Sequence, residues 1–283
     1  METYGAEMSF GVGTEGLADS LKYLQKKWPE ADFPLVPLDD IKGSIGEDKR
    51  LKRLDAVAEA CRRIEKAGSA ILEKGEVPLF VGGDHAAAIG TVAASAKYYP
   101  GEALIWIDAH SDIHTPDSTI SGNIHGMPAA LALGEGERSL LDIFTHFILP
   151  EKLLMLGLRD VEAPEAEHLR EWGIKSYSWE TIREKGLDEV LDEVISYLQE
   201  QQSDGVHISL DIDGMDPELM PGVSVPVAGG FRPEEAEKMV ETLAKAFPLR
   251  ALDLVEYNYL KDQDDRTASW LVSFLKKCQE VSA

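Results

Sequence analysis

The chain has 283 residues, 44% of them hydrophobic, and its formal net charge is −23. This length and composition are typical of a globular protein with a full core, and they fit one large α/β domain. So acidic a surface argues against nucleic acid and anionic membranes as partners, whereas it attracts cations, including divalent metals and guanidinium compounds.

The two cysteines and the hydrophobic runs indicate the cellular compartment to expect. Cys61 falls in a helical pattern and reads as a small core residue, Cys278 lies near the end of the chain, and neither belongs to a CxxC motif. No stretch has the pattern of a signal peptide or the length to span a bilayer. We therefore expect a cytoplasmic protein.

Short apolar runs alternate with amphipathic stretches along the chain. The runs, which predict buried strands, are residues 77–81, 103–107, 153–158, 206–210 and 251–255. The stretches with helical spacing are residues 51–74, 85–97, 187–201 and 233–246, the last with Pro233 in its first turn. This alternation predicts βαβ units and a single α/β domain, residues 1–283, with three layers and a mostly parallel central sheet.

Polar side chains follow the carboxyl ends of these strands, where open parallel sheets bind ligands. They are Asp84-His85, Asp108 to Asp112, Arg159-Asp160, Asp211 to Asp213 and Glu256. If the strands are parallel, all five groups share one edge of the sheet.

Two of these groups have the composition of a metal site. Asp108, His110 and Asp112 alternate along the chain, as do Asp211 and Asp213. In an extended strand, alternate side chains point to one face, so each group would converge. Buried carboxylates need a cation, and several that can bridge favour two metals rather than one.

The histidines are unevenly distributed. His85, His110, His114 and His125 lie within about forty residues of one another around the first acidic group. His207 lies inside a strand and reads as a structural residue, and His146 and His168 have no ligand-like neighbours.

These motifs, in this order, resemble those of the ureohydrolases, and the likeness runs from about residue 9 to the C-terminus. They are Gly-Gly-Asp-His at 82–85, Asp-Ala-His-Ser-Asp at 108–112, Ser-Gly-Asn-Ile-His-Gly-Met-Pro at 121–128, Ser-Leu-Asp-Ile-Asp-Gly-Met-Asp-Pro at 209–217, Pro-Gly-Val-Ser-Val-Pro-Val-Ala-Gly-Gly at 221–230 and Val-Glu-Tyr-Asn at 255–258. The motif at 121–128 is similar to that of arginases rather than of agmatinases or formiminoglutamases.

The resemblance implies two Mn²⁺ ions per chain, which suits a ligand set of carboxylates with some imidazole. One ion would take His85, Asp108, Asp112 and Asp211. The other would take Asp108, His110, Asp211 and Asp213, so that Asp108 and Asp211 bridge.

It also implies hydrolysis of a guanidino group to urea and an amine, by a water that the metals activate. His125 would move the proton, Glu256 would hold the guanidinium through a charge-assisted pair, and Asp112 would complete the catalytic centre.

The amino-acid end of the substrate is where the chain departs from the arginase pattern. Ser121 and Asn123 match positions that bind the α-carboxylate, and Glu165 matches the second acid near the α-amino group. His114 replaces an asparagine, Glu162 an aspartate and Val225 a threonine. We expect L-arginine as substrate, with the reactions of an agmatinase, guanidinobutyrase or formiminoglutamase as the alternative.

The beginning of the chain departs as well. Residues 1–8 are short and polar for the family's first strand, so we expect that the sheet lacks an edge strand or that the chain starts downstream of the usual start. Residues 10–13 resemble the glycine-rich turn that follows that strand.

The resemblance to the family also implies a homo-oligomer, either a trimer or a hexamer. Two further alternatives are a non-catalytic homologue and a single-zinc deacetylase of the same fold.

Overall fold

A parallel sheet forms the centre of the protein in the computed structural model, which describes residues 1–10, 16–30, 33–41 and 50–280. Its strands are β1 (Glu2–Gly5), β2 (Pro78–Val81), β3 (Ala103–Ile107), β4 (Leu153–Leu158), β5 (Lys175–Ser178), β6 (Val206–Asp211) and β7 (Leu249–Val255). Their order across the sheet is β1-β2-β7-β6-β3-β4-β5, and every pairing is parallel. The predicted α/β class is therefore confirmed.

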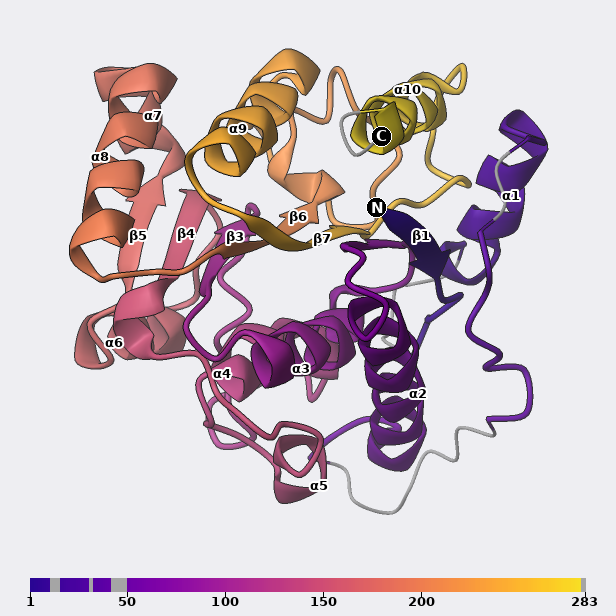
Figure 1. Cartoon of the computed structure of the whole chain (residues 1–283), viewed down its shortest axis with the longest axis horizontal. Helices are drawn as coiled ribbons and strands as arrows, with labels where there is room; N and C mark the ends of the chain where they lie inside the picture. The colour runs from indigo at the N-terminus through magenta and orange to yellow at the C-terminus, as the bar shows by residue number, and fades with distance from the viewer. Residues whose placement is uncertain (11–15, 31–32, 42–49, 281–283) are drawn as a thin grey trace.

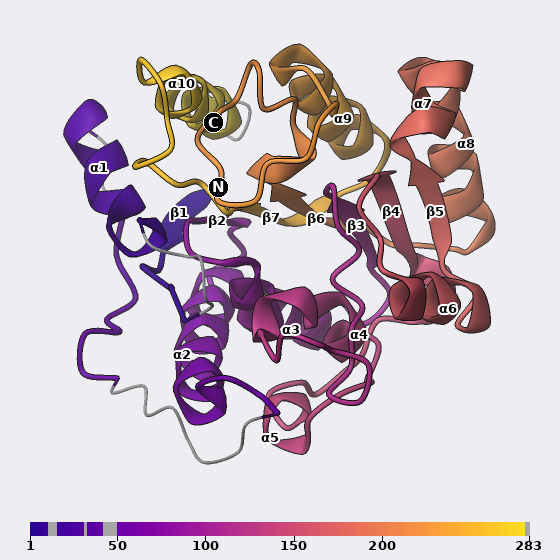
Figure 2. The same ribbon diagram turned by 180° about the vertical axis from the view of Figure 1, so that it is seen from behind.

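Helices cover both faces of this sheet (Figures 1 and 2). On one side lie α2 (Leu54–Leu72), α3 (Ala88–Tyr98), α4 (Pro128–Ala132) and α5 (Arg138–Leu141), and on the other α1 (Ser20–Lys27), α7 (Trp179–Lys185), α8 (Leu187–Glu200), α9 (Pro233–Ala246) and α10 (Arg266–Glu280). The short α6 (Ala163–Glu171) follows β4. Within the part of the chain that is described, no helix has the length and apolar character to cross a bilayer.

The pleat of the strands explains why both faces need cover. In β3, Ile105 and Ile107 pack into the core on the α8–α9 side, whereas Leu104 and Trp106 pack into the core on the α2–α3 side. All of these side chains are fully buried. A strand buried on both faces is uniformly apolar, which is why the sequence predicted β3 at its observed bounds.

The two edge strands differ from prediction. The structure has β1 at one edge, hydrogen-bonded in parallel to β2, so the expectation that the sheet lacks an edge strand is wrong. At the other edge β5 has the sequence Lys-Ser-Tyr-Ser and was not predicted. Short polar segments are common at sheet edges, where one side of the strand has no partner and apolar patterning is weak. The glycine-rich turn expected at residues 10–13 lies almost wholly outside the described residues.

Candidate active site

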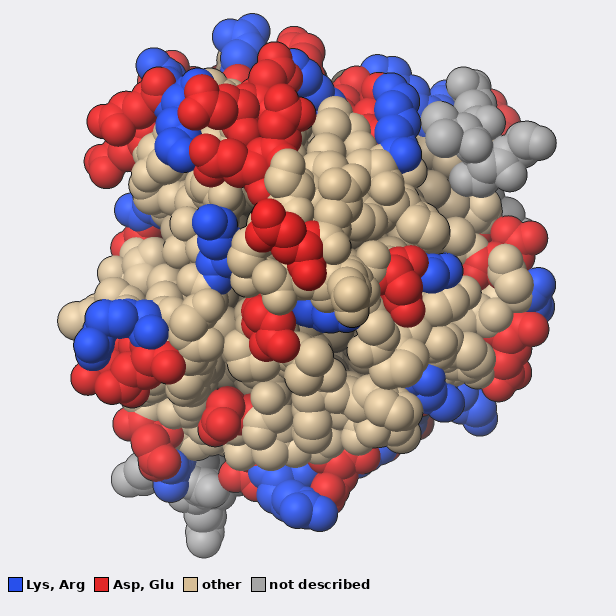
Figure 3. Space-filling model, turned by 60° about the vertical axis from the view of Figure 1, so that its left-hand side comes forward, with Lys and Arg blue, Asp and Glu red and all other residues tan. Residues whose placement is uncertain are grey.

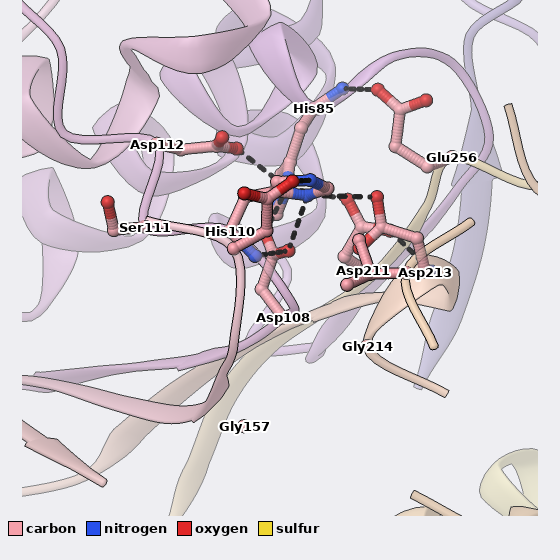
Figure 4. A network of polar contacts seen from close by, with 12 residues as sticks. His85, Asp108, His110, Ser111, Asp112, Gly157, Asp211, Asp213, Gly214 and Glu256 are labelled. Carbon is pink, nitrogen blue, oxygen red and sulfur yellow. Dashed lines mark hydrogen bonds and ion pairs between the residues drawn. The ribbon is translucent and has the colours of Figure 1, made fainter. Parts of the chain in front are cut away.

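Four adjacent strands, β2, β7, β6 and β3, supply the site at their carboxyl ends. His85 follows β2, Glu256 follows β7, Asp211 ends β6 with Asp213 close behind, and Asp108 follows β3. The predicted convergence of the polar groups at one edge is therefore observed (Figure 4). His85, Asp211, Asp213 and Glu256 line a pocket of about 260 Å³ together with His125, whereas Asp108 is fully buried.

The local geometry of the acidic motifs differs from the extended form that was expected. β3 ends at Ile107, and Asp112 adopts a left-handed backbone with φ of 48°. Asp213 lies in a 3₁₀ turn, Ile212–Gly214, that begins directly after β6. The carboxylates still meet because tight turns, rather than strand alternation, direct them inward. An Asp side chain closes each turn by accepting a backbone N–H: Asp108 accepts that of His110 at 2.7 Å, and Asp211 accepts that of Asp213 at 2.7 Å.

His85 is enclosed and held from several sides. Its ring stacks on the Trp106 ring at 4.0 Å between centroids, and its Nε2 lies 3.0 Å from Ser209 Oγ. Its backbone N–H donates to Glu256 Oε1 at 2.8 Å. The preceding Gly83 has φ of 80°, and a Cβ there would lie 2.8 Å from Met8 Cβ, so only glycine fits this turn.

The other ring nitrogen of His85 faces only carboxylates. Nδ1 lies 3.1 Å from Asp108 Oδ2, 3.1 Å from Asp112 Oδ2 and 3.0 Å from Asp211 Oδ2, yet it makes no hydrogen bond within the described residues. A buried ring nitrogen without a hydrogen bond, amid three carboxylate oxygens, has the environment of a metal ligand.

A second cluster adjoins the first and shares one residue with it. His110 Nδ1 lies 3.2 Å from Asp213 Oδ2 and 3.5 Å from Asp108 Oδ1. The ligand atoms of His85, Asp108 and Asp211 lie within 4.8 Å of one another, as do those of Asp108, His110 and Asp213. Asp108 thus offers one oxygen to each cluster. Its Oδ2 also accepts the Trp106 indole N–H at 2.9 Å, which fixes the orientation of the carboxylate.

Without a cation, the carboxylates of the cluster repel one another, and their pKa values are shifted. Burial and the charge of Asp108 raise the pKa of Asp112 to about 7, and burial together with Asp213 raises that of Asp211 well above its usual range. Burial alone would lower the pKa of His85, but the surrounding carboxylates raise it well above its usual value. Carboxylates that cannot all ionise together, with imidazole beside them, fit hard divalent ions such as Mn²⁺.

Glu256 and His125 also line the pocket. Glu256 is 7% exposed and, like Asp112, has a left-handed backbone, with φ of 63°. Burial and the charge of Asp84 raise the pKa of its carboxyl group well above the usual range. His125 lies in a 3₁₀ turn (Ile124–Gly126), its Nδ1 has no hydrogen-bond partner among the described residues, and burial lowers its pKa.

The residues expected at the amino-acid end of the substrate line the same pocket: His114, Ser121, Asn123, Glu162 and Glu165, with Val225 beside them. His114 Nε2 lies 3.4 Å from Glu162 Oε2, so the two main departures from the arginase pattern form a pair. Val225 is 48% exposed.

Glu165 is engaged by the protein itself. Its Oε1 accepts the Ser111 hydroxyl at 2.7 Å, and its Oε2 accepts the Glu162 backbone N–H at 2.9 Å in a capping box that starts α6. It therefore ties the metal-site loop to α6.

Several contributing residues were not predicted. Trp106 and Ser209 lie two positions before Asp108 and Asp211, and this spacing near the strand ends could have revealed them. Arg159 was noted only for its position; its guanidinium donates to the backbone oxygens of the Asp213 turn, with Nη2 2.7 Å from Asp213 O. No local pattern indicates that contact.

Of the histidines outside the site, His207 is structural as predicted. It is fully buried and bonds Asp253 Oδ2 through Nε2 at 2.9 Å and Ser95 Oγ through Nδ1 at 2.7 Å.

A three-layer α/β fold with paired carboxylate–imidazole clusters at the carboxyl ends of its strands defines a metal-dependent hydrolase. A sequence model of the Arginase family matches residues 12–279. The chain belongs to the arginase family, whose enzymes act on guanidino groups.

Individual relatives agree with this assignment. The chain is 42% identical to the arginase of Bacillus caldovelox over 230 residues, 81% of this chain and 77% of that protein. The solved structure of that arginase superposes with a TM-score of 0.88, at 36% identity over 97% of this chain and 96% of the other. Entamoeba histolytica arginase in complex with L-ornithine superposes with a TM-score of 0.87, at 26% identity over 97% of this chain and 98% of the other.

Proposed function

We propose that this protein is a binuclear manganese enzyme that hydrolyses L-arginine to L-ornithine and urea. The observation that carries the proposal is the position of Asp108, whose two oxygens face two separate imidazole–carboxylate clusters. Its arginase relatives support the choice of substrate. The net charge of −23, with acidic side chains gathered at the upper left of the face in Figure 3 and scattered elsewhere on it, favours the approach of a cationic substrate.

One ion would be held by His85, Asp108, Asp112 and Asp211. The other would be held by Asp108, His110, Asp211 and Asp213, with Asp108 and Asp211 in contact with both. When bound, two such ions supply a water whose pKa is lowered toward neutrality.

Glu256 would bind the guanidinium. Its Oε1 already accepts a backbone N–H from His85, which fixes the carboxylate and leaves Oε2 for a charge-assisted hydrogen bond from the substrate.

His125 would carry the proton to the leaving amine. Because burial lowers the pKa of its imidazole, the ring is neutral near pH 7 and can take up a proton at a nitrogen that no described protein group occupies. Asp112, whose Oδ2 lies 3.1 Å from His85 Nδ1, would act as a metal ligand at the catalytic centre.

The amino-acid end of the substrate would lie between residues 119–123 and the start of α6. Ser121 and Asn123 would receive the α-carboxylate, and Glu162 the α-amino group, with Glu165 holding the start of α6 in place.

A second candidate is hydrolysis of a different guanidino compound, such as agmatine or guanidinobutyrate. The pairing of His114 with Glu162 favours it, because Glu162 is then partly occupied and the exposed Val225 supplies no polar contact.

We further propose that the protein is cytoplasmic and forms a trimer or hexamer of one-domain subunits, as the resemblance to its family suggests. Analytical ultracentrifugation of the Mn²⁺-loaded protein measures the oligomeric state.

Urea release tests the function directly. The protein is loaded with Mn²⁺ and assayed with L-arginine, agmatine, guanidinobutyrate and formiminoglutamate, and bound metal is counted. We expect the highest kcat/KM for L-arginine, loss of activity on chelation and two Mn²⁺ per chain. Turnover only of another substrate would select the second candidate, and one zinc per chain without urea release would favour a deacetylase.

A further inference from the structure

The loop that ends the pocket, residues 119–123, presents three polar side chains to it, those of Thr119, Ser121 and Asn123. The protein satisfies an acceptor atom of each. Thr119 Oγ1 accepts the Gly122 backbone N–H at 3.0 Å, and Ser121 Oγ accepts the Asn123 backbone N–H at 3.2 Å.

The acceptor of the third side chain is satisfied by a lysine from the loop before α2. Lys52 Nζ donates to Asn123 Oδ1 at 2.9 Å, while the Lys52 backbone N–H donates to Gly122 O at 2.9 Å. Lys52 thus contacts the pocket loop through both its backbone and its side chain. No ion pair of Lys52 is found among the described residues, so its ammonium is not drawn to a carboxylate there.

The hydrogen bond from Lys52 determines whether the side-chain amide of Asn123 turns its oxygen or its NH₂ group toward a ligand. A lysine ammonium can only donate, so Asn123 must turn its oxygen toward Lys52 and its NH₂ group away from it. The two hydroxyl groups of the loop donate to no described protein group. The loop is therefore left with donors, and it complements an anionic acceptor in a pocket whose remaining charged residues are acids and histidines.

We propose that Lys52 is a positioning residue that orients the Asn123 amide, so that this subsite selects guanidino substrates bearing a carboxylate over those without one. The proposal rests on the proposed function for its substrate class. Lys52 does not line the pocket itself, and its influence passes through Asn123.

The test compares ligands that differ only in the carboxylate. L-Ornithine and 1,4-diaminobutane are titrated calorimetrically into the Mn²⁺-loaded protein, and L-arginine and agmatine are compared in steady-state kinetics. The variants are Lys52→Met, which keeps the length of the side chain without its donor, and Lys52→Arg, which keeps a donor-only group. Lys66→Met, at an exposed position of α2, removes the same charge elsewhere.

We expect Lys52→Met to raise the Kd for L-ornithine and the KM for L-arginine about fivefold to tenfold, the effect of losing one oriented hydrogen bond. The kcat for L-arginine should change by less than about twofold, since the bond is the same in ground and transition states. Values for 1,4-diaminobutane and agmatine should not change. Lys52→Arg should restore L-ornithine binding, and Lys66→Met should behave as the wild type.

A double-mutant cycle separates positioning from simple charge attraction. In an Asn123→Ala background, Lys52→Met should have no further effect on L-ornithine binding. Additive effects, an equal loss for both ligands, or unchanged L-ornithine binding in Lys52→Met would each overturn the proposal, as would a wild type that does not prefer L-ornithine to 1,4-diaminobutane. If no urea is released from any substrate, the proposed function fails, and the ornithine titrations still decide the role of Lys52.

Discussion

His85 and Ser209 are joined across the sheet by a contact of 3.0 Å between Nε2 and Oγ, and this contact decides which nitrogen of His85 faces the acidic cluster. Ser209 Oγ in turn donates to Asp253 Oδ2 at 3.3 Å, so the hydroxyl oxygen is left to accept from the ring. With a metal bound, His85 would keep its proton on Nε2 and offer the lone pair at Nδ1, as a metal ligand requires.

Replacement of Ser209 should weaken metal binding. In Ser209→Ala the buried Nε2–H loses its acceptor, and we expect the Mn²⁺ affinity to fall about 10-fold to 100-fold. Competition with a fluorescent chelator measures it. Ser269→Ala, at an exposed position of α10, is the matched control. An unchanged affinity in Ser209→Ala would show that Ser209 does not orient His85.

Replacement of His125 should separate turnover from metal binding. We expect His125→Asn to lower kcat for L-arginine about 10²-fold to 10⁴-fold, the usual contribution of a general acid or base. Bound metal, counted by mass spectrometry, should stay at the wild-type value because His125 belongs to neither cluster. His146→Asn, at an exposed position, should retain full activity. If His125→Asn loses metal as well, the residue is a ligand and its role here is wrong.

Glu102 predicts a pH dependence of stability far from the metal clusters. It is 1% exposed, its Oε1 accepts the Ser95 hydroxyl at 2.6 Å, and burial raises its pKa to about 7 against the lowering influence of His207. An unfolded glutamate has a pKa of about 4.3, so between about pH 4.3 and 7 the folded state retains a proton that the unfolded state releases. This group's contribution to stability therefore falls as pH rises through that window.

Glu102→Gln cannot ionise and should lack that loss. Relative to the wild type, its free energy of unfolding, measured by urea denaturation with metal content held constant, should be larger at pH 8 than at pH 5, meaning that the variant gains relative stability as pH rises. Glu184→Gln, at an exposed position of α7, should give the same difference from wild type at both pH values. If the unfolding free energy of Glu102→Gln minus that of the wild type is equal or smaller at pH 8 than at pH 5, Glu102 is not protonated in the folded protein.

Arg159 should hold the Asp213 turn through the shape of its guanidinium. Nη2 donates toward the backbone oxygens of Asp213 at 2.7 Å and Met215 at 3.1 Å, and Nη1 toward that of Gly214 at 3.2 Å. A lysine keeps the charge but not the planar arrangement of donors. We expect Arg159→Lys to lower the free energy of unfolding by about 2 kcal/mol, the scale of one or two hydrogen bonds to a charged group.

Urea denaturation measures that change. Arg170→Lys, on the exposed face of α6, is the control and should be neutral. A stability of Arg159→Lys equal to that of the control would mean that the backbone of the Asp213 turn holds its form without the guanidinium.

The central strands were predictable because they are buried on both faces. The runs at 103–107 and 153–158 match β3 and β4 at both ends, and the run at 206–210 falls one residue short of β6. The edge strands β1 and β5 escaped prediction because a strand with one neighbour needs few apolar side chains.

The sequence alone determined the chemical kinds of group at the site and that they follow strand ends, since apolar runs and acidic motifs are local. Only the tertiary structure decided how those groups meet. The backbone of Asp112 at φ 48° replaces the expected alternation, and Asp108 lies between two clusters because β2 and β6 bring their own residues to it. The contacts of Lys52 with Asn123 and of His114 with Glu162 each join separate segments of the chain, and packing of the whole chain brings their atoms within reach.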